Sequence, residues 1–238
     1  MQGLGAGQVQ TTGRGPLSDA WIPGISQLQP AKDGGPLRGG LPRVVWQSLE
    51  ADPHTVSARS AAQRIIQLGQ ASHLVWNPVA GEIVQLIPIV RAACGLGSSQ
   101  PGASTEGRLC VQIAVVASAR SPFTAGPLAG LQPILDWLDS WRVLRHWPAG
   151  RPAAFPHGVA APRSSKLWAR GGHFGASQVP GSAAVGPGAL DTDRLTGSAT
   201  GSATGEQDGP SRRGRPLNDL DHIFAARSEL RAPLSRAR

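Results

Sequence analysis

Residues 73–88 read His-Leu-Val-Trp-Asn-Pro-Val-Ala-Gly-Glu-Ile-Val-Gln-Leu-Ile-Pro, and this stretch decides the fold class. It contains two short apolar runs, 73–76 and 83–87, whose residue types are typical of β-strands. The segment between them, 77–81, combines Asn, Pro and Gly, which are turn-forming residues. The pattern predicts a β-hairpin, and a hairpin needs further strands to form a stable sheet.

Those further strands are predicted on both sides of the hairpin. Residues 43–46 form a short apolar run, and residues 109–117 are almost entirely apolar, which is typical of a strand buried on both faces. Apolar residues recur every three or four positions over 57–68 and over 127–144, so both segments predict amphipathic helices. We therefore expect an α/β fold, with a mixed central β-sheet flanked by helices.

The regions outside this core have a different composition. Residues 1–40 are rich in Gly and Pro and predict an irregular N-terminal arm, which leaves 41–195 as the folded domain. Residues 196–214 contain a short Gly-Ser-Ala-Thr repeat that predicts a flexible linker. Residues 215–238 predict a basic C-terminal tail, in which Asn218 is positioned to cap a short helix.

The net charge is +8, and nearly all of the positive charge is Arg. Such an excess of positive charge favours an anionic partner. Biased codon usage is the alternative explanation, because it also produces a chain rich in Arg, Ala, Gly and Pro. Cys94 and Cys110 match no metal-binding spacing, and we expect both to be free. No apolar run approaches the ~18 residues that span a bilayer, and the N-terminus lacks the apolar core of a signal peptide. We expect a soluble protein without a membrane partner, either cytoplasmic or reaching the cell wall by a signal-independent route.

The order strand, helix, hairpin, buried strand, helix and Gly-His motif resembles the zinc-dependent N-acetylmuramoyl-L-alanine amidases, whose fold is shared by peptidoglycan recognition proteins. The resemblance rests on residues 44–46, on 73–88, and on the Gly-His-Phe-Gly stretch at 172–175 followed by Gly-Pro-Gly-Ala-Leu-Asp at 186–191. It implies an α/β domain, peptidoglycan as the partner, and hydrolysis of the amide between N-acetylmuramic acid and L-alanine.

The resemblance also implies where a zinc site belongs. The second of three expected ligands is His173, but the first position falls on Gln47 and the third on Gly186. Glutamine is a poor ligand for zinc and glycine has no side chain, whereas a catalytic zinc site needs three protein ligands and an open position. His54 and Asp191 are the alternative sources of the missing ligands. His73, Trp168 and Phe174 are the candidate substrate-binding residues.

The resemblance therefore predicts an amidase-like protein with impaired catalysis, or one that only binds peptidoglycan. Two other functions stay open. Residues 211–238, which include the basic tail, contain seven Arg and three acidic residues, and this suits salt-sensitive binding to nucleic acid or another acidic polymer. The lost ligand positions and the repeat also suit a degenerate product without a selected function.

Overall fold

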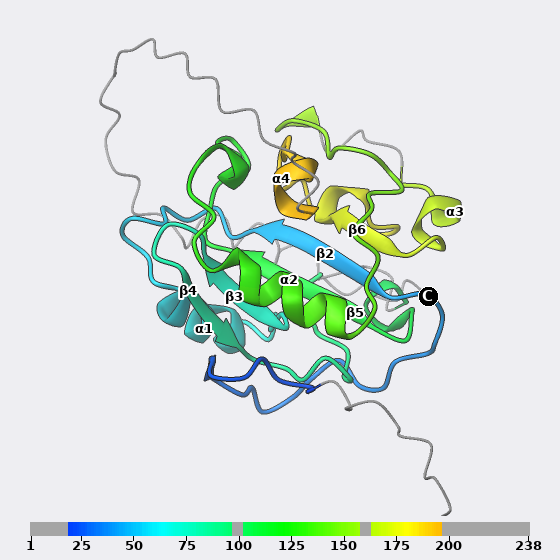
Figure 1. Ribbon diagram of the computed structural model, residues 1–238, viewed down its shortest axis with the longest axis horizontal. Coiled ribbons are helices and arrows are strands. Elements are labelled where there is room, and N and C mark those ends of the chain that lie inside the picture. Colours follow the sequence, from blue (N-terminus) through cyan, green and yellow to red (C-terminus); the bar gives the residue numbers. More distant parts are fainter. Residues whose placement is uncertain (1–18, 97–101, 158–162, 197–238) are drawn as a thin grey trace, which may run out of the picture.

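The computed structural model describes residues 19–96, 102–157 and 163–196, and these form one six-stranded sheet with helices on both faces (Figure 1). The strand order is β1-β4-β3-β5-β2-β6. The strands are β1 (Ser26–Gln27), β2 (Arg43–Ser48), β3 (Leu74–Asn77), β4 (Glu82–Gln85), β5 (Cys110–Val115) and β6 (Gly172–Gly175). The helices are α1 (Ala58–Gln67), α2 (Leu131–Ser140), α3 (Ser165–Trp168) and α4 (Thr192–Thr196), with short 3₁₀ turns η1 (Ala103–Thr105), η2 (Phe123–Ala125) and η4 (Ala176–Gln178). The expected mixed α/β fold is confirmed.

Strands β3, β5, β2 and β6 run parallel to one another, whereas β3 and β4 form the predicted antiparallel hairpin. The turn of this hairpin depends on Asn77, whose side-chain oxygen accepts hydrogen bonds from the backbone N–H groups of Val79 and Ala80. Gly81 follows with φ 71°, a left-handed angle that favours glycine. Four parallel strands place their carboxyl ends at one edge of the sheet.

The two faces of the sheet have different cores because side chains alternate along each strand. On one face, α2 packs against Trp46, Trp76 and Ile113. On the other face, α1 covers Val75 and Ala114, and a separate cluster around Trp168 and Phe174 packs against Val45. Neighbouring residues of β2 therefore belong to different environments, and this decides which side chains meet at the candidate site.

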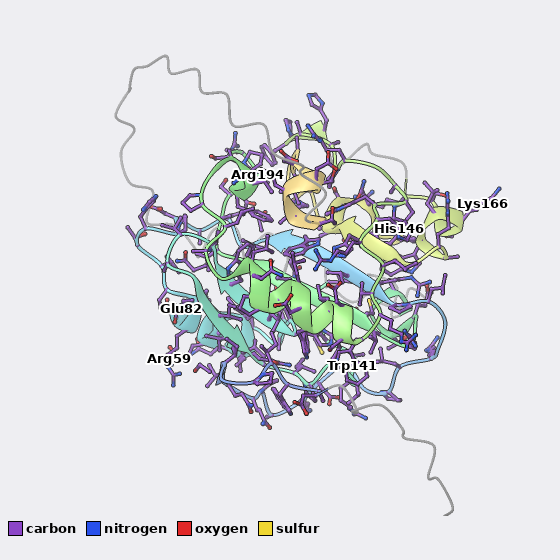
Figure 2. All side chains as sticks on the ribbon, in the orientation of Figure 1. Arg59, Glu82, Trp141, His146, Lys166 and Arg194 are labelled. Carbon is purple, nitrogen blue, oxygen red and sulfur yellow. The ribbon has the colours of Figure 1, made fainter. Side chains whose placement is uncertain are left out.

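Helix α1 closely matches the prediction. Ser57 caps it by accepting a hydrogen bond from the Ser60 backbone N–H. The carboxylate of Glu82, on β4, accepts hydrogen bonds from the backbone N–H groups of Ala58 and Arg59 at 2.6 and 3.2 Å. Figure 2 labels Glu82 and Arg59 beside each other. A negative charge at a helix N-terminus is stabilising, so this contact ties α1 to the hairpin.

Two predicted boundaries differ from the structure. Helix α2 begins at Leu131 and ends at Ser140, shorter than 127–144, because Gly130 and Arg142 on either side have positive φ angles. The arm is not wholly irregular, since β1 pairs with β4 and Ile22 enters the core. The buried Gln85 side chain holds this arm by accepting from the Ile22 N–H and donating to the Ala20 carbonyl.

The predicted linker after Thr196 and the basic tail lie outside the described residues. Within the described part of the chain, no helix has the length and apolar character needed to cross a membrane.

We predict that Leu138→Ala lowers the free energy of unfolding by roughly 2–5 kcal/mol, because this α2 side chain is 1% exposed and its loss leaves a cavity. Urea denaturation measures the change. Leu144→Ala is the matched control, since Leu144 is 56% exposed and its truncation should have little effect. Equal effects of the two substitutions would contradict the packing of α2 against the sheet.

Candidate functional site

His173 lies at the centre of the predicted site, on β6, and is 1% exposed. In the sheet register it pairs with Val44 of β2, so it shares a face with Val44 and Trp46. The Trp46 indole Nε1–H donates a hydrogen bond to Nδ1 of His173 at 3.0 Å, and the two rings stack at a centroid distance of 6.0 Å. The lone pair of Nδ1 is therefore already used by a group that is only a donor.

Gln47, the expected first ligand position, does not face His173. It points to the opposite face of the sheet, where its amide donates to the Ser72 hydroxyl at 2.5 Å. The physical reason is the strand period of two, because moving one residue along β2 reverses the side-chain direction. The β2 residue that reaches His173 is Trp46, which the sequence predicted as part of a strand and of the resemblance but not as a ligand position.

Gly186, the expected third ligand position, does lie near this end of β2. A Cβ atom at Gly186 would be 2.5 Å from the Ser48 hydroxyl oxygen, and Ser48 is on the same face of β2 as Trp46. Its backbone carbonyl accepts a hydrogen bond from the Ser177 N–H at 2.8 Å. Trp46, His173 and Gly186 are therefore brought to one region, but only His173 offers a metal-binding atom.

The alternative ligands do not complete a site. Asp191 accepts hydrogen bonds from the backbone N–H groups of Asp193 and Arg194, so its carboxylate caps α4. His54 lies in a pocket at the edge of the sheet. Within residues 19–96, 102–157 and 163–196, no three His, Cys, Asp or Glu side chains are grouped to hold a metal ion. The residues present at the expected positions do not fit a zinc centre.

The three expected substrate-binding residues are all buried. His73 is fully buried, donates from Nε2 to the Arg91 carbonyl at 2.8 Å and accepts at Nδ1 from the Gln112 N–H at 3.0 Å. Trp168 and Phe174 are 2% and 1% exposed. They pack against each other with their ring centroids 4.9 Å apart. None of the three presents a surface to a ligand, and each has a structural explanation in its contacts.

Burial also sets the charge of the two interior histidines. Desolvation lowers the pKa of His173 to about 3, and His146 and Arg145 add to this effect. Desolvation likewise lowers the pKa of His73 to about 4, against an opposing effect of the hydrogen bond to Arg91. Both imidazoles are neutral at physiological pH.

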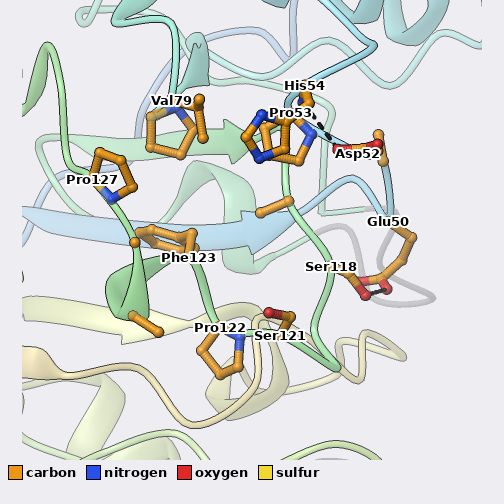
Figure 3. A pocket seen from close by; sticks show the side chains of 15 residues that line it. Glu50, Asp52, Pro53, His54, Val79, Ser118, Ser121, Pro122, Phe123 and Pro127 are labelled. Atoms are coloured by element: carbon orange, nitrogen blue, oxygen red, sulfur yellow. Dashed lines mark hydrogen bonds between the residues drawn. The ribbon is translucent and has the colours of Figure 1, made fainter. Parts of the chain in front are cut away.

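A pocket of about 440 Å³ lies at the carboxyl ends of β2, β3 and β5 (Figure 3). The carboxyl edge of parallel strands is the usual place for ligands in α/β sheets, and the volume is within the range of small-molecule sites. Apolar and polar side chains both line it. The apolar ones include Pro53, Pro78, Val79, Phe123 and Pro127, and the polar ones include Glu50, Asp52, His54, Ser118 and Ser121.

Glu50 shapes this pocket rather than standing free in it. Its carboxylate accepts hydrogen bonds from the hydroxyls of Ser48 and Ser118 and from the Ala119 backbone N–H. Its φ of 53° is left-handed, which is uncommon for a residue with a side chain. The bonds from Ser118 and Ala119 hold the loop after β5 against the loop after β2. Sequence reasoning missed this pocket because its residues come from separate turns with no shared motif.

No known protein family matches this sequence, and no curated protein matches it. Among solved structures, the chain is similar to a selenomethionine derivative of AmpD, with a TM-score of 0.46 and 16% identity over 78% of this chain and 99% of that one. It is similar to the Staphylococcus aureus hydrolase AmiA in complex with its ligand, with a TM-score of 0.44 and 12% identity over 74% and 81%. A third is the N-acetylmuramoyl-L-alanine amidase endolysin LysCS of Clostridium intestinale, with a TM-score of 0.42 and 12% identity over 75% and 97%. These values are too low to transfer an activity or a residue role to this chain.

We predict that the protein loses stability as the pH falls from about 6.5 towards 4. The unfolded histidines take up protons near pH 6.5, whereas folded His73 and His173 stay neutral down to about 4 and about 3. Protons therefore bind preferentially to the unfolded chain in this window, and each histidine contributes a slope of up to about 1.4 kcal/mol per pH unit. Above about pH 6.5 the histidines are neutral in both states, so the free energy of unfolding is not reduced by this effect. Urea unfolding at several pH values measures the slope, and a flat profile between pH 6.5 and 5 would contradict the burial of both rings.

Proposed function

We propose that this chain is a peptidoglycan-binding protein with an amidase-like fold that does not hydrolyse its ligand. The observation that carries the proposal is the hydrogen bond from Trp46 to Nδ1 of His173. In an amidase this face of the sheet needs metal-ligating atoms, and here an indole N–H fills the place of one ligand and consumes the lone pair of another.

The loss of hydrolysis follows from the same contact. Amide hydrolysis by this type of enzyme depends on a metal ion that lowers the pKa of bound water to about 7. The side chains at the expected positions and in contact with them are an indole and a neutral imidazole, and Gly186 has no side chain. Within the described residues, no three His, Cys, Asp or Glu side chains are grouped to hold a metal ion. The chain therefore has no means to activate water at this position.

Binding is supported by the pocket and by the resemblance of residues 73–88 and 172–191 to the amidase motifs. The apolar side chains of the pocket together with the carboxylate of Asp52 suit an extended peptide that carries both apolar groups and an amine. The peptide stems of peptidoglycan have this chemistry. The pocket is open to ligand even though the metal-ligand region is filled.

Co-sedimentation with purified peptidoglycan tests the proposal. We expect the full chain to sediment with the wall material at both low and high salt, and to release no soluble peptide. Ser121→Trp should reduce the bound fraction severalfold, because the new ring fills the pocket that Ser121 lines. Gln63→Trp is the control, since it adds the same side chain at an exposed position on α1.

Each contrary result has a clear meaning. Binding that disappears at high salt would point to the basic tail and a general acidic polymer, and would contradict the proposal. Equal loss with both variants would show that the pocket is not the binding site. Release of muropeptides by the unmodified chain would restore the enzyme interpretation.

A second experiment tests the metal-ligand region itself. We predict that the unmodified chain binds zinc weakly or not at all by calorimetry, and that Trp46→His with Ser48→Ala and Gly186→Asp raises zinc affinity by orders of magnitude. The Ser48 change removes the hydroxyl that a side chain at position 186 would meet. The matched control replaces Trp46→His by Gln47→His, which places the imidazole on the opposite face. Equal zinc affinity in the two variants would contradict the assignment of Trp46.

A further inference from the structure

Exposed basic side chains surround the amino ends of the parallel strands, at the edge of the sheet opposite the pocket. Arg108 lies two residues before β5, and Arg170 lies two residues before β6. Both strands begin beside β2, because Arg43 of β2 pairs with Cys110 on one side and with Gly172 on the other. Neighbouring strands are about 4.8 Å apart, so the starts of β5 and β6 are roughly 10 Å apart. The two exposed Arg residues therefore stand on either side of β2.

Short contacts bring two more Arg residues to the same edge. The residue after Arg38 forms an antiparallel bridge with the residue before Arg108. The Arg108 guanidinium donates a hydrogen bond to the carbonyl of Trp141 at 3.1 Å, at the end of α2, and Arg142 is the next residue. This bond uses one of the five N–H donors of Arg108, and the others remain available because the side chain is exposed.

Helix α3 adds a fifth positive charge. The Arg43 side chain donates to the Trp168 carbonyl at 2.8 Å, which holds the end of α3 at the start of β2. Figure 2 labels Lys166 of α3 and Trp141 on the side of the sheet where β2 begins. We call this surface the basic edge, and its exposed side chains are Arg38, Arg108, Arg142, Lys166 and Arg170.

Carboxylates do not neutralise the basic edge. Within residues 19–96, 102–157 and 163–196, none of its five side chains forms an ion pair. The two acidic residues in this region have other partners, since Glu106 accepts from the Trp168 indole at 2.6 Å and Asp139 pairs with Arg145. Five cations on one rigid edge produce a positive field that attracts an anionic polymer.

The residue types favour a nucleic acid duplex as that polymer. Four of the five cations are Arg, whose planar guanidinium can bind two oxygens of one phosphate. A duplex carries one negative charge per roughly 1.7 Å of its axis, so several fixed cations each meet a phosphate. Single strands bind by stacking their bases on aromatic rings, but Trp168 is 2% exposed and the Trp141 indole is bonded to the Asp19 carbonyl. Contacts to phosphate alone carry no sequence information.

We propose that the basic edge binds the phosphate backbone of a nucleic acid duplex without base specificity. The interaction is independent of the proposed peptidoglycan binding, because the pocket is lined by other residues at the carboxyl ends of the strands. It is also distinct from binding by the basic tail, because all five side chains belong to the folded domain.

The test measures the affinity of the full chain for a short mixed-sequence DNA duplex by fluorescence anisotropy at several salt concentrations. The edge variant combines Arg108→Gln, Arg142→Gln and Arg170→Gln. The matched control is a tail variant that loses the same three charges outside the edge, through Arg212→Gln, Arg213→Gln and Arg215→Gln. We expect the edge variant to reduce the slope of log K against log salt by roughly two to three, because each phosphate contact contributes about 0.9. The tail variant should reduce it by less than about one.

A Lys variant at the same three edge positions separates charge from folding, since Lys also contacts phosphate as a point charge. It should keep the slope of the unmodified chain, and its Tm reports whether the fold is retained. A folded Lys variant that loses the slope would overturn the proposal. So would a tail variant that loses as much of the slope as the edge variant. Tighter binding to single-stranded DNA or to polyglutamate than to the duplex would also overturn it, by assigning the basic edge to another polymer.

Discussion

The contact between Trp46 and His173 joins the central strand β2 to the edge strand β6, and much of the region beyond β2 depends on it. Strand β6 has β2 as its strand partner in the sheet order, so it is held from one side. The indole adds a buried hydrogen bond and a stacked ring to that pairing. Trp46 also packs against Trp76 and Phe123, so the same side chain connects β6 to the main core.

This contact also uses the nitrogen of His173 that faces β2. The Trp46 indole occupies the space beside the imidazole ring and donates its hydrogen to Nδ1. Burying a polar atom is costly unless it is hydrogen-bonded, and here the two nitrogens satisfy each other.

Much of the fold followed from local sequence patterns. The hairpin, β2, β5 and α1 were predicted because their apolar periodicity and their turn or cap residues agree, as with Asn77 and Ser57. The length of α2 was not predicted, because the left-handed angle at Gly130 and its close approach to Gly81 leave no signal in the apolar stripe. The docking of the arm through Gln85 was also missed, since it joins residues 63 positions apart.

The candidate site was harder to predict than the fold because it depends on register and burial. The resemblance placed the first ligand position at Gln47, and the strand period of two directs this side chain to the face opposite His173. His73, Trp168 and Phe174 have residue types that are common in binding sites, yet their environments make them interior residues. Trp147 and His173 show the converse: two side chains of ordinary core type leave donors without acceptors, which only the assembled rings reveal.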